Sequence, residues 1–172
     1  MNEHMAAASV KPRVAVLGTG IMGAGMAERL LEQGFAVDVW DRTPAAAARL
    51  TQRGATAHAT AGDAAGGSEV VVTMLPTGDA VTDVMLRQNA LSAMPPDAIW
   101  AQMGTIGLEA TQKLNEEVTN RRPDVAFVDA PVSGTKDPAR HGQLTILPSG
   151  PDRARARLDP VFNALGQRVV WL

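Results

Sequence analysis

Short apolar runs alternate with amphipathic segments along most of the chain. The first run covers residues 13–17 and stops at a glycine, and residues 21–33 follow with large apolar side chains at intervals of three and four positions. Such intervals place the apolar side chains on one face of a helix. A second apolar run covers residues 35–40. The pattern therefore predicts a strand, a helix and a strand within about thirty residues, the size of one βαβ unit.

The same alternation continues to the last residue. Further strands are predicted over residues 69–75, 98–103, 125–129, 143–147 and 168–172. Further helices are predicted over residues 43–53, 78–86, 108–119 and 152–165. A glycine-rich stretch over 62–67 is expected to interrupt the chain. Strands that alternate with helices predict an α/β fold, in which a mostly parallel sheet carries helices on both faces.

Composition narrows the class of protein. The 172 residues are 45% apolar and 20% charged, which suits one globular domain, and no apolar run is long enough to cross a bilayer. With 16 basic and 18 acidic side chains the net charge is −2, so neither nucleic acid nor a membrane is an expected partner. The first residues lack the pattern of a signal peptide. We expect a flexible tail over residues 1–12 and one domain over 13–172.

Two missing residue types exclude further chemistry. The chain has no cysteine and no tyrosine, so disulfides, thiolate ligands and a Tyr-Lys proton donor are excluded within it. The lack of cysteine fits a cytoplasmic protein. The three histidines do not have the spacing of metal ligands, and no metal is expected.

A glycine motif lies between the first predicted strand, which ends at Leu17, and the first predicted helix. Gly18-Thr19-Gly20-Ile21-Met22-Gly23 matches G-x-G-x-x-G in the strand-turn-helix context that the motif requires. Gly18 permits a tight turn, Gly20 lets the backbone approach a pyrophosphate, and Gly23 lets helix and strand pack closely. Backbone N–H groups and the positive end of the helix would face the phosphates. The motif predicts a dinucleotide site in a Rossmann-type, doubly wound fold.

The choice between NAD and NADP falls to Asp41-Arg42-Thr43, at the end of the second predicted strand. Asp41 can accept a hydrogen bond from a ribose 2′-hydroxyl and would repel a 2′-phosphate. Arg42 offers a planar cation suited to that phosphate, with Thr43 as a second donor. Alternatively, Arg42 stacks over the adenine. The residues favour NADP slightly and leave NAD or dual use open.

Three more motifs follow in order along the chain. They are Met74-Leu75-Pro76, Met103-Gly104-Thr105-Ile106, and Asp129-Ala130-Pro131-Val132-Ser133-Gly134, which leads into Gly142-Gln143-Leu144-Thr145. With the glycine motif, they resemble the β-hydroxyacid dehydrogenase family, which includes 3-hydroxyisobutyrate dehydrogenase and the glyoxylate/succinic semialdehyde reductases. That family shares its cofactor domain with 6-phosphogluconate dehydrogenase. The resemblance runs from Val14 to Leu172.

The resemblance implies roles for particular residues. Met74, Leu75 and Pro76 would pass the cofactor, and Thr105 would lie near its nicotinamide end. Ser133 and Gly134 would bind the carboxylate of a small substrate. Thr135, followed by Lys136, is similar to the glyoxylate and succinic semialdehyde reductases. The implied activity is the NAD(P)-dependent interconversion of a small β-hydroxyacid and its semialdehyde or oxoacid.

The resemblance also implies what this sequence lacks. In the family a catalytic lysine lies on a helical domain beyond the cofactor domain, and this chain ends before such a domain, so no catalytic residue is expected here. Two alternatives stay open: an imine reductase, against which the motif at residues 129–134 argues, and a non-catalytic dinucleotide-binding module. A homo-oligomer is expected where the helical domain is present.

Overall fold

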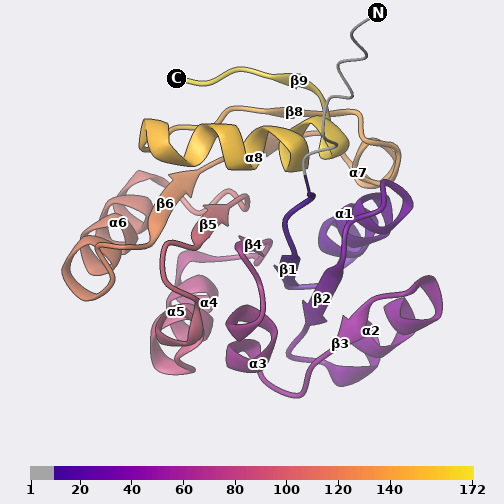
Figure 1. Ribbon diagram of the computed structural model, residues 1–172, viewed down its shortest axis with the longest axis horizontal. Helices are drawn as coiled ribbons and strands as arrows, with labels where there is room; N and C mark the ends of the chain where they lie inside the picture. The colour runs from indigo at the N-terminus through magenta and orange to yellow at the C-terminus, as the bar shows by residue number, and fades with distance from the viewer. Residues whose placement is uncertain (1–9) are drawn as a thin grey trace, which may run out of the picture.

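The computed structural model describes residues 10–172, which form two sheets flanked by helices (Figure 1). The main sheet has six strands in the order β3-β2-β1-β4-β5-β6, and all neighbouring pairs are parallel. Its strands are β1 (Val14–Leu17), β2 (Val37–Trp40), β3 (Thr56–Ala57), β4 (Val70–Thr73), β5 (Ile99–Gln102) and β6 (Ala126–Asp129). The predicted α/β fold with a parallel sheet is confirmed.

Helices cover both faces of the main sheet (Figure 1). One face packs against α1 (Ile21–Glu32), α2 (Pro44–Ala48), the 3₁₀ helix η1 (Arg49–Arg53), α7 (Lys136–His141) and α8 (Asp152–Leu165). The other face packs against α3 (Ala61–Gly66), α4 (Gly78–Thr82), the π-helical turn η2 (Asp83–Arg87), α5 (Ala90–Ala93) and α6 (Leu108–Arg121). The sheet is therefore doubly wound, as the alternation of strands and helices predicts.

The central strand β1 shows why the strands are short apolar runs. Val14 and Val16 face the layer with α1 and α8, whereas Ala15 and Leu17 face the layer with α3 and α4. All four side chains are 0% exposed. A strand buried on both faces is mostly apolar instead of alternating, and β1 is apolar at all four positions.

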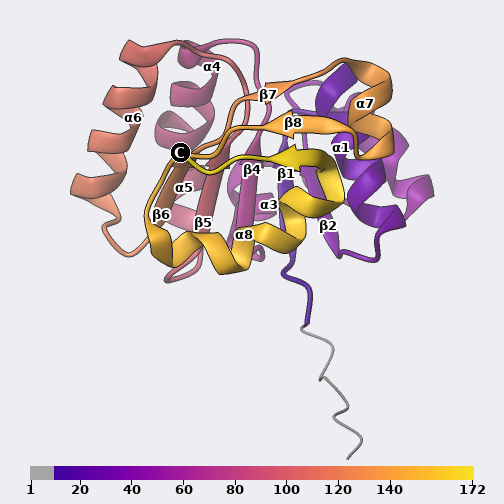
Figure 2. The same ribbon diagram turned by 90° about the horizontal axis from the view of Figure 1, so that it is seen from above.

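The last three strands form a separate sheet. β7 (Val132–Ser133) is antiparallel to β8 (Leu144–Ile146), and β8 is parallel to β9 (Gly166–Val169). Figure 2 shows these strands lying across those of the main sheet. The prediction that the chain continues one mostly parallel sheet to its end is wrong here. Only two residues separate β6 from β7, and a parallel crossover needs about a dozen, so β7 cannot extend the sheet as a parallel strand beside β6.

Several short elements also differ from the sequence prediction. Of the stretch over 62–67, expected to interrupt the chain, residues 62–66 belong to α3 and Gly67 follows its last residue. Thr60 Oγ1 caps the first turn of α3 by accepting the N–H of Asp63 at 3.0 Å. The helix expected over 78–86 is α4 followed by η2. Strand β3 and helices α5 and α7 were not predicted, because two to six residues are too few to show a period.

The predicted tail over 1–12 lies mostly outside the described residues, which begin at residue 10. Lys11, within that range, contacts the body of the domain. Its ammonium donates to the carbonyl oxygen of Gln33 and lies 5.1 Å from the ring centroid of Phe35.

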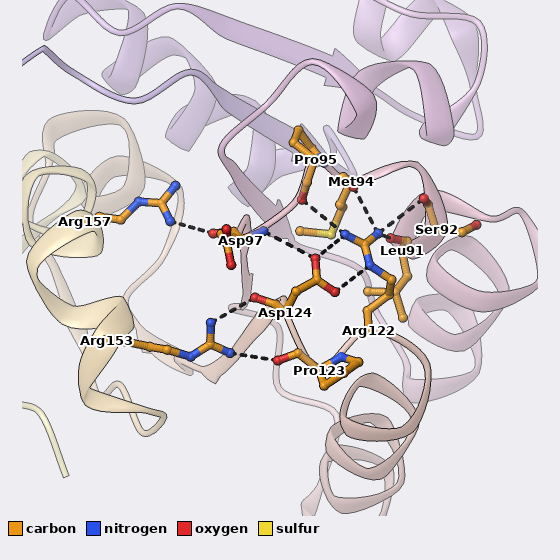
Figure 3. Close-up of polar contacts among 10 residues, drawn as sticks. All are labelled: Leu91, Ser92, Met94, Pro95, Asp97, Arg122, Pro123, Asp124, Arg153 and Arg157. Atoms are coloured by element: carbon orange, nitrogen blue, oxygen red, sulfur yellow. Dashed lines mark hydrogen bonds and ion pairs between the residues drawn. The ribbon is translucent and has the colours of Figure 1, made fainter.

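Arginine side chains join the segments before β5 and β6 (Figure 3). Arg122 donates to four carbonyl oxygens around the end of α5, those of Leu91, Ser92, Met94 and Pro95. It also pairs with Asp124, and this pair holds the pKa of the Asp124 carboxyl well below its usual range. From α8, Arg153 and Arg157 donate to the carbonyl oxygens of Asp124 and Asp97. These contacts tie α5, α6 and α8 together at the amino ends of the strands.

Candidate functional site

The turn between β1 and α1 requires glycine at two of its three motif positions. Gly18 has a φ of 99°, and a Cβ atom there would lie 2.4 Å from the carbonyl oxygen of Met74. A Cβ atom on Gly23 would lie 1.8 Å from the carbonyl oxygen of Gly18. At Gly20, by contrast, φ is −65° and a Cβ atom would meet nothing within 4 Å. The fold does not need a glycine there, so the open space beside Gly20 is available to a ligand.

Asp41, directly after β2, fixes the glycine turn to the next loop. Its Oδ2 accepts the backbone N–H of Thr19 at 2.7 Å and the Thr19 hydroxyl at 3.2 Å. Its Oδ1 accepts the backbone N–H of Thr43 at 2.8 Å. Because each carboxylate oxygen carries two lone pairs, Asp41 can still accept a hydrogen bond from a ribose hydroxyl.

Arg49 contacts the same turn from the other side, and the sequence analysis did not find it. Its Nη2 donates to the carbonyl oxygen of Thr19 at 3.0 Å. The buried residue Thr19 is therefore bound at its N–H by the anion Asp41 and at its C=O by the cation Arg49. An arginine on a short alanine-rich helix resembles an ordinary solvated side chain, so the sequence carried no signal for this contact.

A cavity of about 470 Å³ opens beside the turn, at the carboxyl edge of the main sheet. It brings together most of the predicted cofactor-binding residues: Gly18, Gly20, Ile21, Met22, Gly23, Asp41, Arg42, Met74, Leu75 and Pro76. Four others do not line it. Leu17 and Thr19 are buried in the domain, and Thr43 and Thr105 are exposed outside the cavity.

Five further residues line the cavity without having been predicted: Trp40, Ala80, Asp83, Val84 and Gln88. Trp40 ends β2, and the others come from α4, η2 and the residue after η2. The positions 80, 83 and 84 have the spacing of one helix face, directly after the motif at 74–76. That spacing was a usable signal.

A buried chain of hydrogen bonds sets the loops after β4 and β5. Trp100 Nε1 donates to Thr73 Oγ1 at 2.9 Å, and the Thr73 hydroxyl donates to Gln102 Oε1 at 2.8 Å. Gln102 Nε2 then donates to the carbonyl oxygen of Gly104 at 2.6 Å. A Cβ atom on Gly104 would lie 2.8 Å from the carbonyl oxygen of Leu75, so the two loops meet closely. Thr105 follows on the surface of this junction.

The residues predicted to bind substrate lie around β7, and none of them lines the cavity. Ser133, Gly134 and Thr135 are exposed. Gly134 has a φ of 144°, and a Cβ atom there would lie 2.7 Å from Leu144 Cδ2. Asp129 begins the motif over residues 129–134, and burial raises the pKa of its carboxyl.

Helix α7 connects this segment to the glycine turn. It packs along α1, where a Cβ atom on Gly25 would lie 3.3 Å from the backbone nitrogen of Arg140. The Arg140 guanidinium pairs with Glu28 and, at 2.6 Å, with Glu32, both on α1. Lys136 and His141 are the first and last residues of α7. Helix α1, which begins at the glycine turn, therefore also packs against α7, the helix that follows Ser133.

Within residues 10–172, no group of three or more His, Asp or Glu side chains is placed to hold a metal ion. None of the helices described has both the length and the apolar composition needed to cross a membrane.

The geometry fits a dinucleotide. The glycine turn leads directly into α1, a side chain at position 20 would occupy open space, and the cavity continues past a carboxylate at the end of β2. These features define the class: a doubly wound α/β domain with a dinucleotide-binding turn. Residues 13–172 match the family model described as the NAD binding domain of 6-phosphogluconate dehydrogenase, and the chain belongs to this family.

The chain is similar to proteins named as dehydrogenases and reductases. The chain is 34% identical over 158 residues to an NAD-dependent L-serine dehydrogenase of Pseudomonas aeruginosa, covering 91% of this chain and 52% of the relative. It is 33% identical over 160 residues to glyoxylate/succinic semialdehyde reductase 1 of Arabidopsis thaliana, covering 92% and 55%. The solved 3-hydroxyisobutyrate dehydrogenase of Mycobacterium tuberculosis with L-serine superposes with a TM-score of 0.87 at 27% identity, covering 94% and 54%. The chain thus spans about half the length of the relatives it matches.

The recognised resemblance to β-hydroxyacid dehydrogenases is confirmed by these matches. Imine reductases are also among the solved structures that share the fold.

Proposed function

We propose that the chain binds a nicotinamide dinucleotide in the cavity beside α1. It would serve as the cofactor-binding half of an oxidoreductase that interconverts a small β-hydroxyacid and its semialdehyde or oxoacid. The observation that carries the proposal is the open space at Gly20, between two glycines that the fold itself requires. When bound, the nicotinamide supplies hydride transfer, and the residues of this chain bind and orient the dinucleotide.

Three groups of residues have separate roles in binding the cofactor and the substrate. Backbone N–H groups at Gly20, Ile21 and Met22 face the pyrophosphate at the positive end of α1. Met74, Leu75 and Pro76 pass the cofactor, and Thr105 lies near its nicotinamide end. Ser133, Gly134 and Thr135 bind the carboxylate of the substrate through a hydroxyl and exposed backbone N–H groups.

We favour NADP slightly over NAD. Arg42 is exposed and lines the cavity beside Asp41, where its guanidinium can meet a 2′-phosphate. Both oxygens of Asp41 already accept backbone N–H groups, and the positive ends of these N–H dipoles offset part of the carboxylate's repulsion of this phosphate. The cytoplasmic location and the homo-oligomer stay predictions.

The alternative reaction, imine reduction, is supported by the imine reductases that share the fold. Against it stands the motif Asp129-Ala130-Pro131-Val132-Ser133-Gly134, which resembles the hydroxyacid enzymes. The non-catalytic binding module shares the cofactor site and differs only in the absence of turnover.

The binding proposal is tested by calorimetric titration of the 172-residue chain with NADPH, NADH and ADP-ribose. We expect saturable binding of all three, because the cavity takes the part that they share. If the folded chain binds none of them at millimolar concentration, the proposed function is wrong.

A further inference from the structure

The cavity wall formed by η2 carries a polar pair that the proposed binding of phosphate and ribose does not use. Gln88 Nε2 donates to Asp83 Oδ2 at 2.7 Å, and both side chains line the cavity. The pair brackets a π-helical turn, whose wider backbone ring is common at functional sites. Gln88 is exposed and Asp83 is partly buried, so both are available to a ligand.

The position of this wall identifies the part of the dinucleotide that it would meet. The cavity contains Asp41 and Arg42 at the end of β2, but Thr105 lies outside it. It therefore fits the pyrophosphate and the adenosine half, with the ribose at Asp41. A base attached to that ribose extends toward η2, where Ala80 and Val84 provide an apolar surface for its ring face.

The hydrogen bond between the two side chains leaves a defined set of free groups. An ionised Asp83 only accepts hydrogen bonds, so Gln88 must turn its NH₂ group toward Asp83. The Oε1 atom and the second amide hydrogen of Gln88 then remain for a ligand. A glutamine amide with these two groups free pairs with the N6 amino group and N7 of adenine.

We propose that Gln88 recognises the edge of the adenine base and that Asp83 positions its amide for this. Gln88 Oε1 accepts from the N6 amino group, and the Gln88 amide donates to N7. This inference rests on the proposed binding of a dinucleotide and adds selectivity for its base. Gln88 is the specificity-determining residue and Asp83 the positioning residue.

The test uses a pair of ligands that differ at one position of the base. The 172-residue chain is titrated calorimetrically with NADH and with reduced nicotinamide hypoxanthine dinucleotide, in which a carbonyl oxygen replaces the N6 amino group. That oxygen would face Gln88 Oε1, acceptor against acceptor. We expect the hypoxanthine form to bind about fivefold or more weakly, the low end for a bidentate contact.

Three variants assign the effect to the pair. Gln88→Met keeps the length of the side chain without its amide, and we expect the two ligands to bind it almost equally. Asp83→Asn can accept or donate, which frees the Gln88 amide to turn over, so the ratio of the two dissociation constants should fall between those of wild type and Gln88→Met. Gln112→Met is the matched control, because Gln112 is exposed on α6 and lines no part of this cavity. It should keep the wild-type ratio.

The outcomes separate this inference from the proposed function. Tight binding of both ligands by wild type with equal constants would overturn base recognition and leave dinucleotide binding intact. A wild-type ratio retained in Gln88→Met would also overturn it. If neither ligand binds to the wild-type chain, the proposed function fails, and base recognition fails with it.

Discussion

The carbonyl oxygen of Gly18 occupies the space that a side chain on Gly23 would need, 1.8 Å from the position of its Cβ atom. The space beside Gly20 is open. Gly23 is therefore required by packing within the fold, whereas Gly20 leaves room for a ligand. Substitutions at the two positions should affect stability and cofactor binding separately. Gly20→Val should leave the melting temperature close to wild type and abolish cofactor binding in calorimetry, because the valine fills the pyrophosphate position.

The matched change is Gly23→Ala. It forces a methyl group into backbone, and overpacking of this kind costs about 1–3 kcal/mol of unfolding free energy, measured by urea denaturation. Unchanged affinity in Gly20→Val would contradict the location of the site, and unchanged stability in Gly23→Ala would contradict the packing argument.

The second prediction concerns the choice of cofactor. Arg42→Ala should weaken NADPH binding by about 1.5–3 kcal/mol, the range for hydrogen bonds to a charged group, and should leave NADH almost unchanged. Asp41→Asn should favour NADPH further. Equal losses for both cofactors in Arg42→Ala would mean that Arg42 only stacks on the adenine, and the preference for NADP would be wrong.

Arg49 gives a contrasting expectation, since its contact in the structure is with the Thr19 carbonyl oxygen at 3.0 Å. Arg49→Met removes a donor that holds the turn, so NADH and NADPH should weaken by the same factor. Titration with both cofactors measures this. A loss confined to NADPH would show that Arg49 binds the 2′-phosphate directly.

Local sequence predicted one side of the cavity and missed the other. Gly18, Gly20 and Gly23 are found from sequence because the whole motif that they form lies within six residues. On the opposite wall, positions 80, 83 and 84 have the spacing of one helix face, whereas Gln88 is brought to the cavity by a π-helical turn that leaves no periodic pattern in the sequence.

The sequence likewise predicted one part of the fold, the parallel strands, and missed another, the second sheet. The parallel strands are recognisable because burial on both faces makes them mostly apolar, and β1 entirely so. The second sheet starts with the two-residue strand β7, and its separation follows from the short connection after Asp129, not from any apolar pattern.

The third prediction concerns stability at the amino ends of the strands. Arg122→Met would remove the guanidinium that donates to four carbonyl oxygens around the end of α5 and pairs with the carboxylate of Asp124 (Figure 3). We expect a loss of about 2–4 kcal/mol in urea denaturation, reduced by solvent screening at the partly exposed Asp124. Arg121→Met is the control. Its pair with Glu117 is exposed, so its loss should stay within about 0.5 kcal/mol.

The fourth prediction concerns acid stability. Burial raises the pKa of the Asp38 carboxyl, but hydrogen bonds from Arg13, His58 and Ser68 outweigh this, and the pKa lies below its usual value. A carboxyl with a lower pKa in the folded state contributes stability above its unfolded pKa of about 3.9 and loses that contribution as pH falls. Asp38→Asn should therefore lower stability at pH 7 and flatten its decline between about pH 5 and 2. An equally steep decline in the variant would assign the acid sensitivity to other carboxyls.

The last prediction concerns catalysis. Reducing a carbonyl group needs a proton donor near the developing alkoxide, and general acid catalysis of this kind contributes about 10²–10⁴ in rate. Near Ser133 the described residues offer Lys136, which is exposed at the start of α7 and away from the cavity. We therefore expect the 172-residue chain to bind cofactor without measurable reduction of glyoxylate or succinic semialdehyde in a spectrophotometric assay. A longer protein that includes the second half found in the relatives should turn over, and by more than the acid contribution alone, because that half would complete the substrate pocket. Turnover by the 172-residue chain that disappears in Lys136→Ala would instead make Lys136 the proton donor.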